Sequence, residues 1–377
     1  RLVLSGTPIQ NSVMELFTLF EFLMPDFLGK IEDYRKKFVK PIEAVQPSTS
    51  VGSKYLYTSH VQREIYVMAM EKLHKKVLPF LKRRVKHDVL QDLPPKIIQD
   101  RICDMPIWQK KIYNKMENNL QISANIAQQL HLRMICTHPF LLSNPLKNSI
   151  DYEKSHNKVN NVVIDQNNVV DEDVGDDREN KSDYDCIDGV DADVDCAKIQ
   201  GLKQLFLECG VRNVRNLEVK HLTDDKDVVH TRNDKSHRFV IFVQFKKTLK
   251  FLEENFCKKY FSELKYLRLD SDVLPNDRQS MIDEFNANTG YKFLLTTTKV
   301  GGLGINLTGA NIVVFFEHDW NPQMDLQAMD RVHRIGQTRV TNVVRLLCKD
   351  TIEERVMTLQ RFKLNVANKI ISTSAST

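Results

Sequence analysis

From about residue 238 onward, short apolar runs alternate with amphipathic segments. Runs such as "RFVIFVQF" and "NIVVFF" are continuously apolar, which is typical of strands buried on both faces of a parallel sheet. The segments between them have helical spacing. The pattern therefore predicts an α/β domain with a covered parallel sheet. Its expected strands are 239–245, 265–269, 292–297, 312–316 and 341–347, and its expected helices are 247–259, 276–287 and 322–333.

The N-terminal part of the chain has a more helical pattern. "RLVLSGTPIQNSVMELFTLFEFLMP" predicts a short strand, a turn, and a helix capped by Ser12 and Glu15 in a capping box. Residues 46–91 are basic and rich in helical spacing, residues 92–105 alternate like a strand, and residues 107–142 are helical again. This part of the chain is therefore expected to be mainly helical, with one short strand near its start and another at 92–105.

A final helix is expected from Asp350, with Glu353 completing a second capping box. Its apolar residues fall on roughly one stripe, which predicts that the helix packs across a core. The stripe consists of Ile352, Val356, Leu359, Phe362, Val366 and Ile370.

Two polar stretches interrupt these patterns. Residues 146–197 are rich in Asn and Asp, and the part from 151 to 197 holds fifteen Asp/Glu against four Lys/Arg, a local charge of −11. Such a segment has too little apolar surface to offset its ordering entropy, so it is expected to be an acidic disordered insertion. Residues 211–237 are expected to be a loop.

Charge and cysteine content narrow the classes of protein. The net charge is +5, so the chain outside 151–197 carries +16, which suits a polyanionic partner as well as it suits a merely basic surface. The seven cysteines have irregular spacings and no CxxC pair, which argues against a disulfide framework and a zinc site and favours a reducing, intracellular compartment. No apolar run has membrane-spanning length. The N-terminus has neither an initiating Met nor a signal-peptide pattern, so the chain is expected to begin inside a protein.

The stretch "VVFFEHDWNPQMDLQAMDRVHRIGQTRV" puts charged residues directly after a buried strand. Its "NP" has the pattern of an N-cap and a first-turn proline. At about 100° per residue, Gln327, Arg331 and Arg334 fall within about 60° of one another on the following helix. Two guanidiniums and an amide on one face form a fork suited to phosphate. The alternative is that both arginines are surface residues paired with Asp325 and Asp330.

A glycine-rich segment, "FLLTTTKVGGLGINLTGAN", follows another buried strand. Gly301, Gly302 and Gly304 would let the backbone approach a phosphate closely, although a turn without a ligand explains the same residues. The segment matches neither a dinucleotide fingerprint nor a P-loop, and no GxxxxGK[ST] occurs in the chain. "LSGTPIQN" places Thr7 in a strand-to-helix turn, where its hydroxyl can relay between two sites.

Taken in this order, the segments resemble the motifs of the Snf-type ATPases of helicase superfamily two. "LSGTPIQN" is similar to their motif three, "VIFVQF" to motif four, "LLTTTKVGGLGINL" to motif five, "EHDWNP" to its companion element, and "DLQAMDRVHRIGQ" to the highly specific motif six. "DLPPKIIQDRIC" and "LQRFKLNVANKII" are similar to the branch of TATA-binding-protein-associated ATPases, although the wider family fits most of these strings. The family usually has Asp-Gly where this chain has Asp270 and Ser271.

The resemblance implies an α/β fold made of RecA-like parallel-sheet lobes, the end of lobe one plus a complete lobe two, with helical protrusions. The implied domains are 1–105 for the C-terminal part of lobe one with a protrusion at 46–91, 106–145 for a second protrusion or linker, 146–197 for the insertion, 198–348 for lobe two, and 349–377 for a brace helix and tail.

The resemblance also implies residue roles. Arg331 and Arg334 would be arginine fingers that reach the γ-phosphate of ATP, with Gln327 organising the same edge. The implied nucleotide-binding residues are Gly302 and Gly304, and the implied DNA-binding or coupling residues are Thr7, Thr298, Lys299 and Trp320. A core position explains Trp320 equally well. No metal ligand is expected, because the family's Walker elements, which hold Mg²⁺, precede motif three; the chain alone is therefore expected to hydrolyse no ATP.

The expected function is that of the C-terminal part of an ATP-dependent double-stranded-DNA translocase. By its resemblance to the TATA-binding-protein branch, it would remove TATA-binding protein from promoter DNA in the nucleus as a monomeric motor, with no membrane partner. One alternative is a nucleosome remodeller or DNA-repair translocase with the same motor. Another is an inactive DNA-binding or scaffold module, against which the intact Gln327, Arg331 and Arg334 argue.

Overall fold

The computed structural model describes residues 1–47, 59–119, 126–142, 196–211, 237–287, 290–301 and 304–371. Its strands are β1 (Lys96–Cys103), β2 (Phe239–Val243), β3 (Lys265–Leu269), β4 (Tyr291–Thr297), β5 (Ile312–Phe315) and β6 (Thr341–Cys348). Its α-helices are α1 (Met14–Leu23), α2 (Ile31–Tyr34), α3 (Lys40–Glu43), α4 (His60–Val77), α5 (Lys86–Val89), α6 (Ile107–Asn119), α7 (Ile126–Thr137), α9 (Ala197–Glu208), α10 (Lys246–Leu252), α11 (Lys258–Tyr260), α12 (Pro275–Ala287), α13 (Thr298–Gly301), α14 (Pro322–Val332) and α15 (Ile352–Ile371). Short π-helical turns lie at Arg35–Val39 and Glu253–Cys257, and 3-10 turns at Leu78–Phe80 and Pro139–Leu141.

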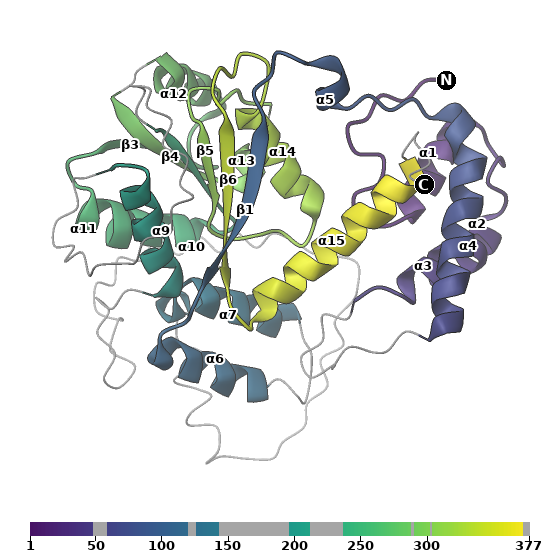
Figure 1. The fold of residues 1–377 in the computed structure, drawn as a ribbon, viewed down its shortest axis with the longest axis horizontal. Coiled ribbons are helices and arrows are strands. Elements are labelled where there is room, and N and C mark those ends of the chain that lie inside the picture. The colour runs from purple at the N-terminus through teal and green to yellow at the C-terminus, as the bar shows by residue number, and fades with distance from the viewer. Residues whose placement is uncertain are drawn as a thin grey trace.

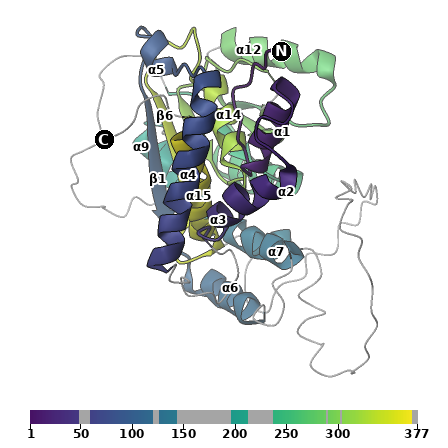
Figure 2. The same ribbon diagram turned by 90° about the vertical axis from the view of Figure 1, so that its right-hand side faces the viewer.

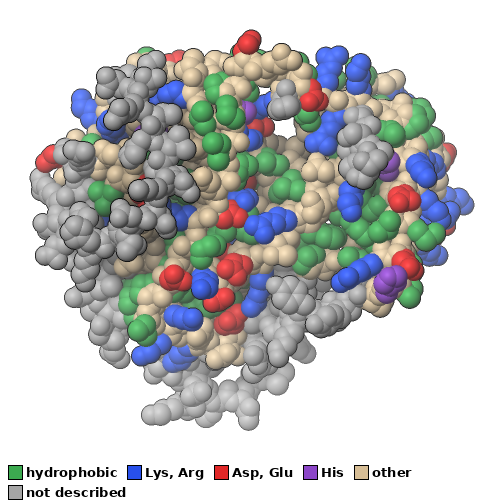
Figure 3. Space-filling model, in the orientation of Figure 1, with side chains coloured by type: hydrophobic (Ala, Val, Ile, Leu, Met, Phe, Trp, Pro, Cys, Tyr) green, Lys and Arg blue, Asp and Glu red, His purple; other side chains and the backbone are tan. Residues whose placement is uncertain are grey.

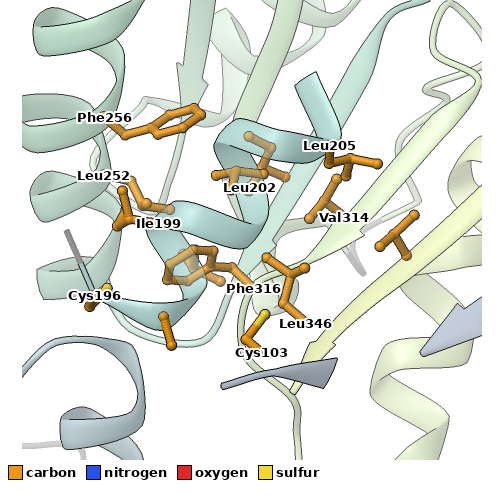
Figure 4. Close-up of a cluster of buried hydrophobic side chains, with 14 of the residues drawn as sticks. Cys103, Cys196, Ile199, Leu202, Leu205, Leu252, Phe256, Val314, Phe316 and Leu346 are labelled. Atoms are coloured by element: carbon orange, nitrogen blue, oxygen red, sulfur yellow. The ribbon is translucent and has the colours of Figure 1, made fainter. Parts of the chain in front are cut away.

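The six strands form one sheet in the order β1-β6-β5-β2-β4-β3, and every neighbouring pair is parallel (Figure 1). Alternate residues of β2 face opposite sides of the sheet. Phe239 and Ile241 join a core cluster with Phe206 of α9, whereas Val240 joins a second cluster with Phe285 of α12. Figure 4 shows part of the first cluster. The predicted parallel α/β sheet with two covered faces is confirmed.

The strand at 96–103 is correctly predicted as a strand, but the structure corrects its partner. β1 pairs in parallel with β6 from Lys96↔Thr341 to Cys103↔Cys348, so it forms an edge of the same sheet. The expectation that residues 92–105 complete lobe one is therefore wrong. An alternating pattern shows that a segment is a strand, but the neighbour with which it pairs is set by contacts far away in sequence.

Residues 1–5 do not form the expected strand, and Leu2 and Leu4 are 81% and 89% exposed. A strand needs a pairing neighbour, and no described strand lies beside this segment. The expected capping box of α1 also differs. The carboxylate of Glu15 accepts the backbone N–H groups of Gln10 and Asn11 instead of that of Ser12, and so fixes the loop before the helix.

The last helix, α15, packs across a core as its apolar stripe predicts, and the structure shows that it reaches two separate core clusters. Ile352 packs in the cluster that contains α9, whereas Val366 and Ile370 pack with Leu73 of α4. Figures 1 and 2 show α15 running from the end of β6 to the helices α1 and α4. Its N-terminus is capped by Thr351, whose hydroxyl accepts the N–H of Glu353, and not by Asp350.

The acidic stretch expected at 146–197 lies outside the described residues except at its end. Cys196 and Ala197 are buried at 0% and 3% exposure, and Ala197 is the first residue of α9. Cys196 and Ala197 therefore belong to the packed core and not to the acidic stretch. The second polar stretch, from 212 to 236, also lies outside the described residues.

Candidate functional site

The candidate site is at the carboxyl edge of the sheet, where the loops after β4 and β5 meet. Asn321 caps α14 by accepting the N–H of Gln323 at 3.0 Å, and Pro322 is the first helical residue, as the sequence predicts. The short helix α13 packs against α14. The backbone N–H of Leu307 donates to the carbonyl of Arg331 at 2.9 Å, which ties the glycine-rich segment to the end of α14.

The two arginines do not both lie on the helix. Arg331 is half-buried on the last turn of α14, near Gln327 one turn earlier, but the helix ends at Val332. Arg334 is exposed in the turn beyond it, and within the described ranges its side chain has no hydrogen bond or ion pair. The prediction of a single helical face is therefore wrong for Arg334. The residues are still three apart in sequence, so one anion can reach both only if the turn after α14 directs Arg334 toward Arg331.

That turn is organised by Gln337, which the sequence reasoning missed. Gln337 is 5% exposed, and its amide donates to the carbonyls of Ala310 at 2.7 Å and of Thr308 at 3.3 Å. Its own carbonyl accepts the N–H groups of Thr338 and Arg339, both at 3.0 Å. A buried glutamine that is satisfied on both sides fixes the chain that carries Arg334. The sequence signal that could have identified Gln337 is a single glutamine directly after Gly336, where the chain bends.

The acidic residues of α14 have other partners than those considered from spacing. Asp330 pairs with Lys86 and Lys96 at 3.0 and 3.1 Å. Asp325 is buried and accepts the side-chain amide of Gln360 at 2.9 Å. These pairings fix α5, the start of β1 and the helix α15 to α14, so the carboxylates hold the edge of the domain together.

His333 contacts the segment before β1. Its Nε2 lies 2.7 Å from the carbonyl of Pro94, and burial lowers its pKa below the ordinary value. Lys86 Nζ donates to the backbone carbonyl of His333 at 2.9 Å. The end of α14 is thus fixed to the segment that enters the sheet.

Of the other expected site residues, some lie at this edge of the sheet and others do not. Thr298 is fully buried, and its hydroxyl donates to the carbonyl of Val243 at 3.2 Å, whereas Lys299 beside it is exposed on α13. Gly304 has φ +51°, a conformation that favours glycine, and Gly302 lies outside the described residues. Thr7 lies in the loop before α1, where its hydroxyl accepts the side-chain amide N–H of Gln10 at 2.9 Å.

Trp320 is half-buried at the opposite end of α14 from Arg331. Its carbonyl accepts Lys363 Nζ of α15 at 3.2 Å, and the same Nζ donates to Asn11 at 3.2 Å. Burial lowers the pKa of Lys363. Lys363 therefore links Trp320 to the loop that contains Thr7 through the brace helix.

Sequence reasoning missed two further residues, Glu317 and Arg133, that contact the segment leading to Trp320. Glu317 is 3% exposed, and its carboxylate accepts the hydroxyls of Thr137 and Thr248, both at 2.8 Å, and the backbone N–H of Gln244 at 2.8 Å. Arg133 of α7 donates to the carbonyl of His318. The sequence shows a glutamate followed by His-Asp-Trp, but the groups that donate hydrogen bonds to this glutamate come from segments far away in the chain.

The described residues contain one group with metal-ligating atoms close together, namely Cys136, Cys348 and Glu353, whose ligand atoms lie within 4.8 Å of one another. One oxygen of Glu353 lies 2.5 Å from Lys198 Nζ, and the other accepts the N–H of Cys348 at 2.9 Å. The ammonium of Lys198 already neutralises the carboxylate, so the group does not fit a metal ion.

The fold and the edge site together define the RecA-like C-terminal lobe of a helicase-type motor. Residues 220–336 match the helicase conserved C-terminal domain. Residues 1–149 match the SNF2-related domain. The chain belongs to the SNF2-related family of ATPases. No helix of the described residues is long and apolar enough to cross a membrane.

Several known proteins are similar along nearly the whole chain. TATA-binding protein-associated factor MOT1 of Saccharomyces cerevisiae is 40% identical over 99% of this chain and 19% of its own length. Human TATA-binding protein-associated factor 172 is 39% identical over 99% of this chain and 19% of its own length. DNA repair and recombination protein RAD26 of Saccharomyces cerevisiae is 32% identical over 99% of this chain and 29% of its own length.

The chain thus spans about a fifth of the length of the first two relatives. A solved structure of the C-terminal part of the Fun30 ATPase domain covers 75% of this chain and all of its own, with 25% identity and a TM-score of 0.47.

Proposed function

We propose that this chain is the C-terminal part of an ATP-dependent double-stranded-DNA translocase that removes TATA-binding protein from promoter DNA in the nucleus. The observation that carries the proposal is similarity over 99% of the chain to factors named for their association with TATA-binding protein. The similarity to the repair protein RAD26 is lower, at 32% identity, which favours the first branch over a repair translocase.

In this proposal ATP is the substrate and Mg²⁺ its counter-ion, held by residues outside the chain. Arg331 and Arg334 contact the γ-phosphate when the two lobes close, and Gln327 supports that edge. A positive charge delivered to the transferring phosphoryl group is worth roughly 10³ to 10⁵ in rate. The exposed guanidinium of Arg334 and the turn fixed by Gln337 support this role, because such a finger must remain accessible while its backbone is held.

The DNA contacts are proposed for the same side of the motor. Lys299 is exposed on α13, and Thr298 below it is anchored to the end of β2. The helical module that carries α4 adds basic charge, with Lys75 and Lys76 in the last turn of that helix, and Figure 3 shows Lys and Arg side chains over it. Basic side chains on several elements suit the phosphates of duplex DNA.

The chain alone is proposed to be inactive, because no GxxxxGK[ST] occurs in its 377 residues. Purified chain should therefore show no ATP turnover with DNA and Mg²⁺, whereas the complete protein should. Turnover by the chain itself would contradict this part of the proposal.

The function is tested with the complete protein and a fluorescent TATA-binding protein bound to promoter DNA. ATP should release the bound protein within the assay, whereas a non-hydrolysable analogue or the Arg331→Ala variant should not. A nucleosome-sliding assay run in parallel separates the alternative. ATP-dependent sliding without release of TATA-binding protein would show a nucleosome remodeller and overturn the proposal.

A further inference from the structure

The segment Glu317–Trp320 is held by the helix α7, which lies in the second helical protrusion. Arg133 and Thr137 are four residues apart on α7, so they lie on the same face of the helix. Arg133 donates to the carbonyl of His318, and Thr137 donates to Glu317 at 2.8 Å. One face of one helix therefore contacts successive residues of the segment that leads to Trp320.

The guanidinium of Arg133 also contacts two aromatic rings. Its central carbon lies 5.4 Å from the ring centre of Phe245 and 5.8 Å from that of Trp320. A planar guanidinium can donate hydrogen bonds in its plane while its faces lie near aromatic rings, which a lysine ammonium cannot do in the same way. Arg133 is thus bonded to the backbone two residues before Trp320 and packed near the indole itself.

A second set of contacts holds the same segment from α15. Gln360 donates to the carbonyl of Asp319, and Lys363 donates to the carbonyl of Trp320 at 3.2 Å. The backbone is therefore fixed by both helices, but the indole of Trp320 has its cation contact with Arg133. A change of Arg133 should disturb the ring and leave the contacts from α15 in place.

We propose that Arg133 is a positioning residue that holds Trp320 for DNA coupling, so that α7 sets the DNA response of the motor. The inference rests on the proposed function and on the DNA-coupling role that the family resemblance implies for Trp320. Arg133 itself acts only through Trp320 and the segment before it. The anchor Glu317 fixes the backbone, and Arg133 fixes the side chain at its end.

The test uses the complete protein, duplex DNA and ATP. Arg133→Met keeps most of the side-chain length but removes the charge and the donors. It should lower DNA-stimulated turnover by roughly tenfold, the scale of a partly desolvated cation–aromatic contact. Turnover without DNA and the melting temperature should stay close to those of the wild type. Arg101→Met, which breaks the surface pair of Arg101 with Glu208 on the outer strand β1, is the matched control and should retain DNA stimulation.

A double-mutant comparison separates positioning from general packing. Trp320→Ala and the double variant Arg133→Met/Trp320→Ala should have the same DNA-stimulated turnover within about twofold, because removing Arg133 has no further effect once the ring is gone. Losses that multiply in the double variant would overturn the inference. So would normal DNA stimulation in Arg133→Met, or a loss that only follows a lower melting temperature.

If Arg133→Met does not fold, Phe245→Leu removes one neighbouring ring and leaves the guanidinium bonded to His318. It should lower DNA stimulation in the same direction by a smaller factor, and unchanged stimulation would overturn the inference. A wild-type protein without DNA-stimulated turnover would overturn the proposed function together with this inference. A stimulated wild type with an unaffected Arg133→Met would overturn the inference alone.

Discussion

The ion pair between Lys198 and Glu353 joins α9 to the first turn of α15. The two side chains are 0% and 5% exposed, and Nζ lies 2.5 Å from the carboxylate. Lys198 also donates to the carbonyl of Phe316 at 2.6 Å, and Glu353 accepts the N–H of Cys348 at 2.9 Å. Burial lowers the pKa of Lys198, but the charge and hydrogen bond of Glu353, together with Cys348 and Cys136, raise it by more in total, so the net pKa lies above the ordinary value and the ammonium remains charged.

Replacing Lys198 alone should be costly because it leaves a buried carboxylate without its cation. Lys198→Met is expected to lower the free energy of unfolding by about 3 to 5 kcal/mol. The double variant Lys198→Met/Glu353→Leu removes both charges and should lose less. It still leaves the carbonyl of Phe316 and the N–H of Cys348 without these partners, each costing about 1 to 3 kcal/mol if no water replaces them.

Urea unfolding of the 377-residue chain, followed by far-UV circular dichroism, measures these differences. Arg355→Met is the control, because Arg355 and Glu117 form a pair that is 34% and 22% exposed and should be worth about 1 kcal/mol or less. A loss below about 1 kcal/mol in Lys198→Met, or a double variant that is less stable than the single one, would refute the reasoning.

Three further predictions concern the edge of lobe two. In the complete protein, Arg334→Ala should lower DNA-stimulated turnover by roughly 10³ to 10⁵ with unchanged DNA binding and melting temperature, and Arg101→Ala on β1 is the control; near-normal turnover would show that Arg334 is no finger. Gln337→Leu should lower the free energy of unfolding by about 1 to 3 kcal/mol in calorimetry, since it leaves buried backbone groups without their hydrogen-bond partners. An unchanged free energy of unfolding would show that Gln337 does not hold this turn. Because burial lowers the pKa of His333, the unfolded state binds a proton first, so stability should fall as pH drops below about 6.5, and His333→Gln should reduce that slope in thermal melts.

Arg339 lies past the end of α14, as Arg334 does, but it would be a poor control for the arginine experiment. It is half-buried, and its guanidinium donates to the carbonyl of Gly309 at 2.7 Å. Arg339→Ala would therefore disturb the glycine-rich segment as well as remove a charge. Arg101 lies on the outer strand β1, where it pairs with Glu208 and makes none of these contacts.

Local patterns predicted most elements of lobe two because each is short and strongly periodic. The strand at 265–269 has the predicted bounds, and the predicted N-cap and proline of α14 are present. The patterns did not give the partner of β1 or the turn that takes Arg334 off the helix α14. β1 pairs with a strand more than 200 residues later, and α14 ends at Val332 where His333 turns to the carbonyl of Pro94. Both are fixed by contacts between distant segments, which spacing along the chain does not show.

The capping signals show the same limit at the scale of single hydrogen bonds. The sequence placed Ser12 with Glu15, and Asp350 with Glu353, at the starts of two helices. The structure uses Glu15 for the N–H groups of the preceding loop, and it uses Glu353 for the buried pair with Lys198. A carboxylate at a helix start is available for a cap, but other donors take it here: N–H groups of the adjacent loop for Glu15, and the ammonium of Lys198 on another helix for Glu353.

Contacts between distant segments also fix the chain on both sides of the acidic stretch between α7 and α9. The described residues on either side of it are fixed to one another. Cys196 is fully buried and lies 2.9 Å from the carbonyl of Thr137, at the end of α7. Thr137 in turn donates to Glu317, and Lys198 donates to the carbonyl of Phe316 next to it. Closing a longer connection between fixed ends adds little free energy, since the cost rises only with the logarithm of its length. The geometry that carries Trp320 therefore depends on how α7 and α9 are anchored to the end of β5, and not on the length of the chain between them.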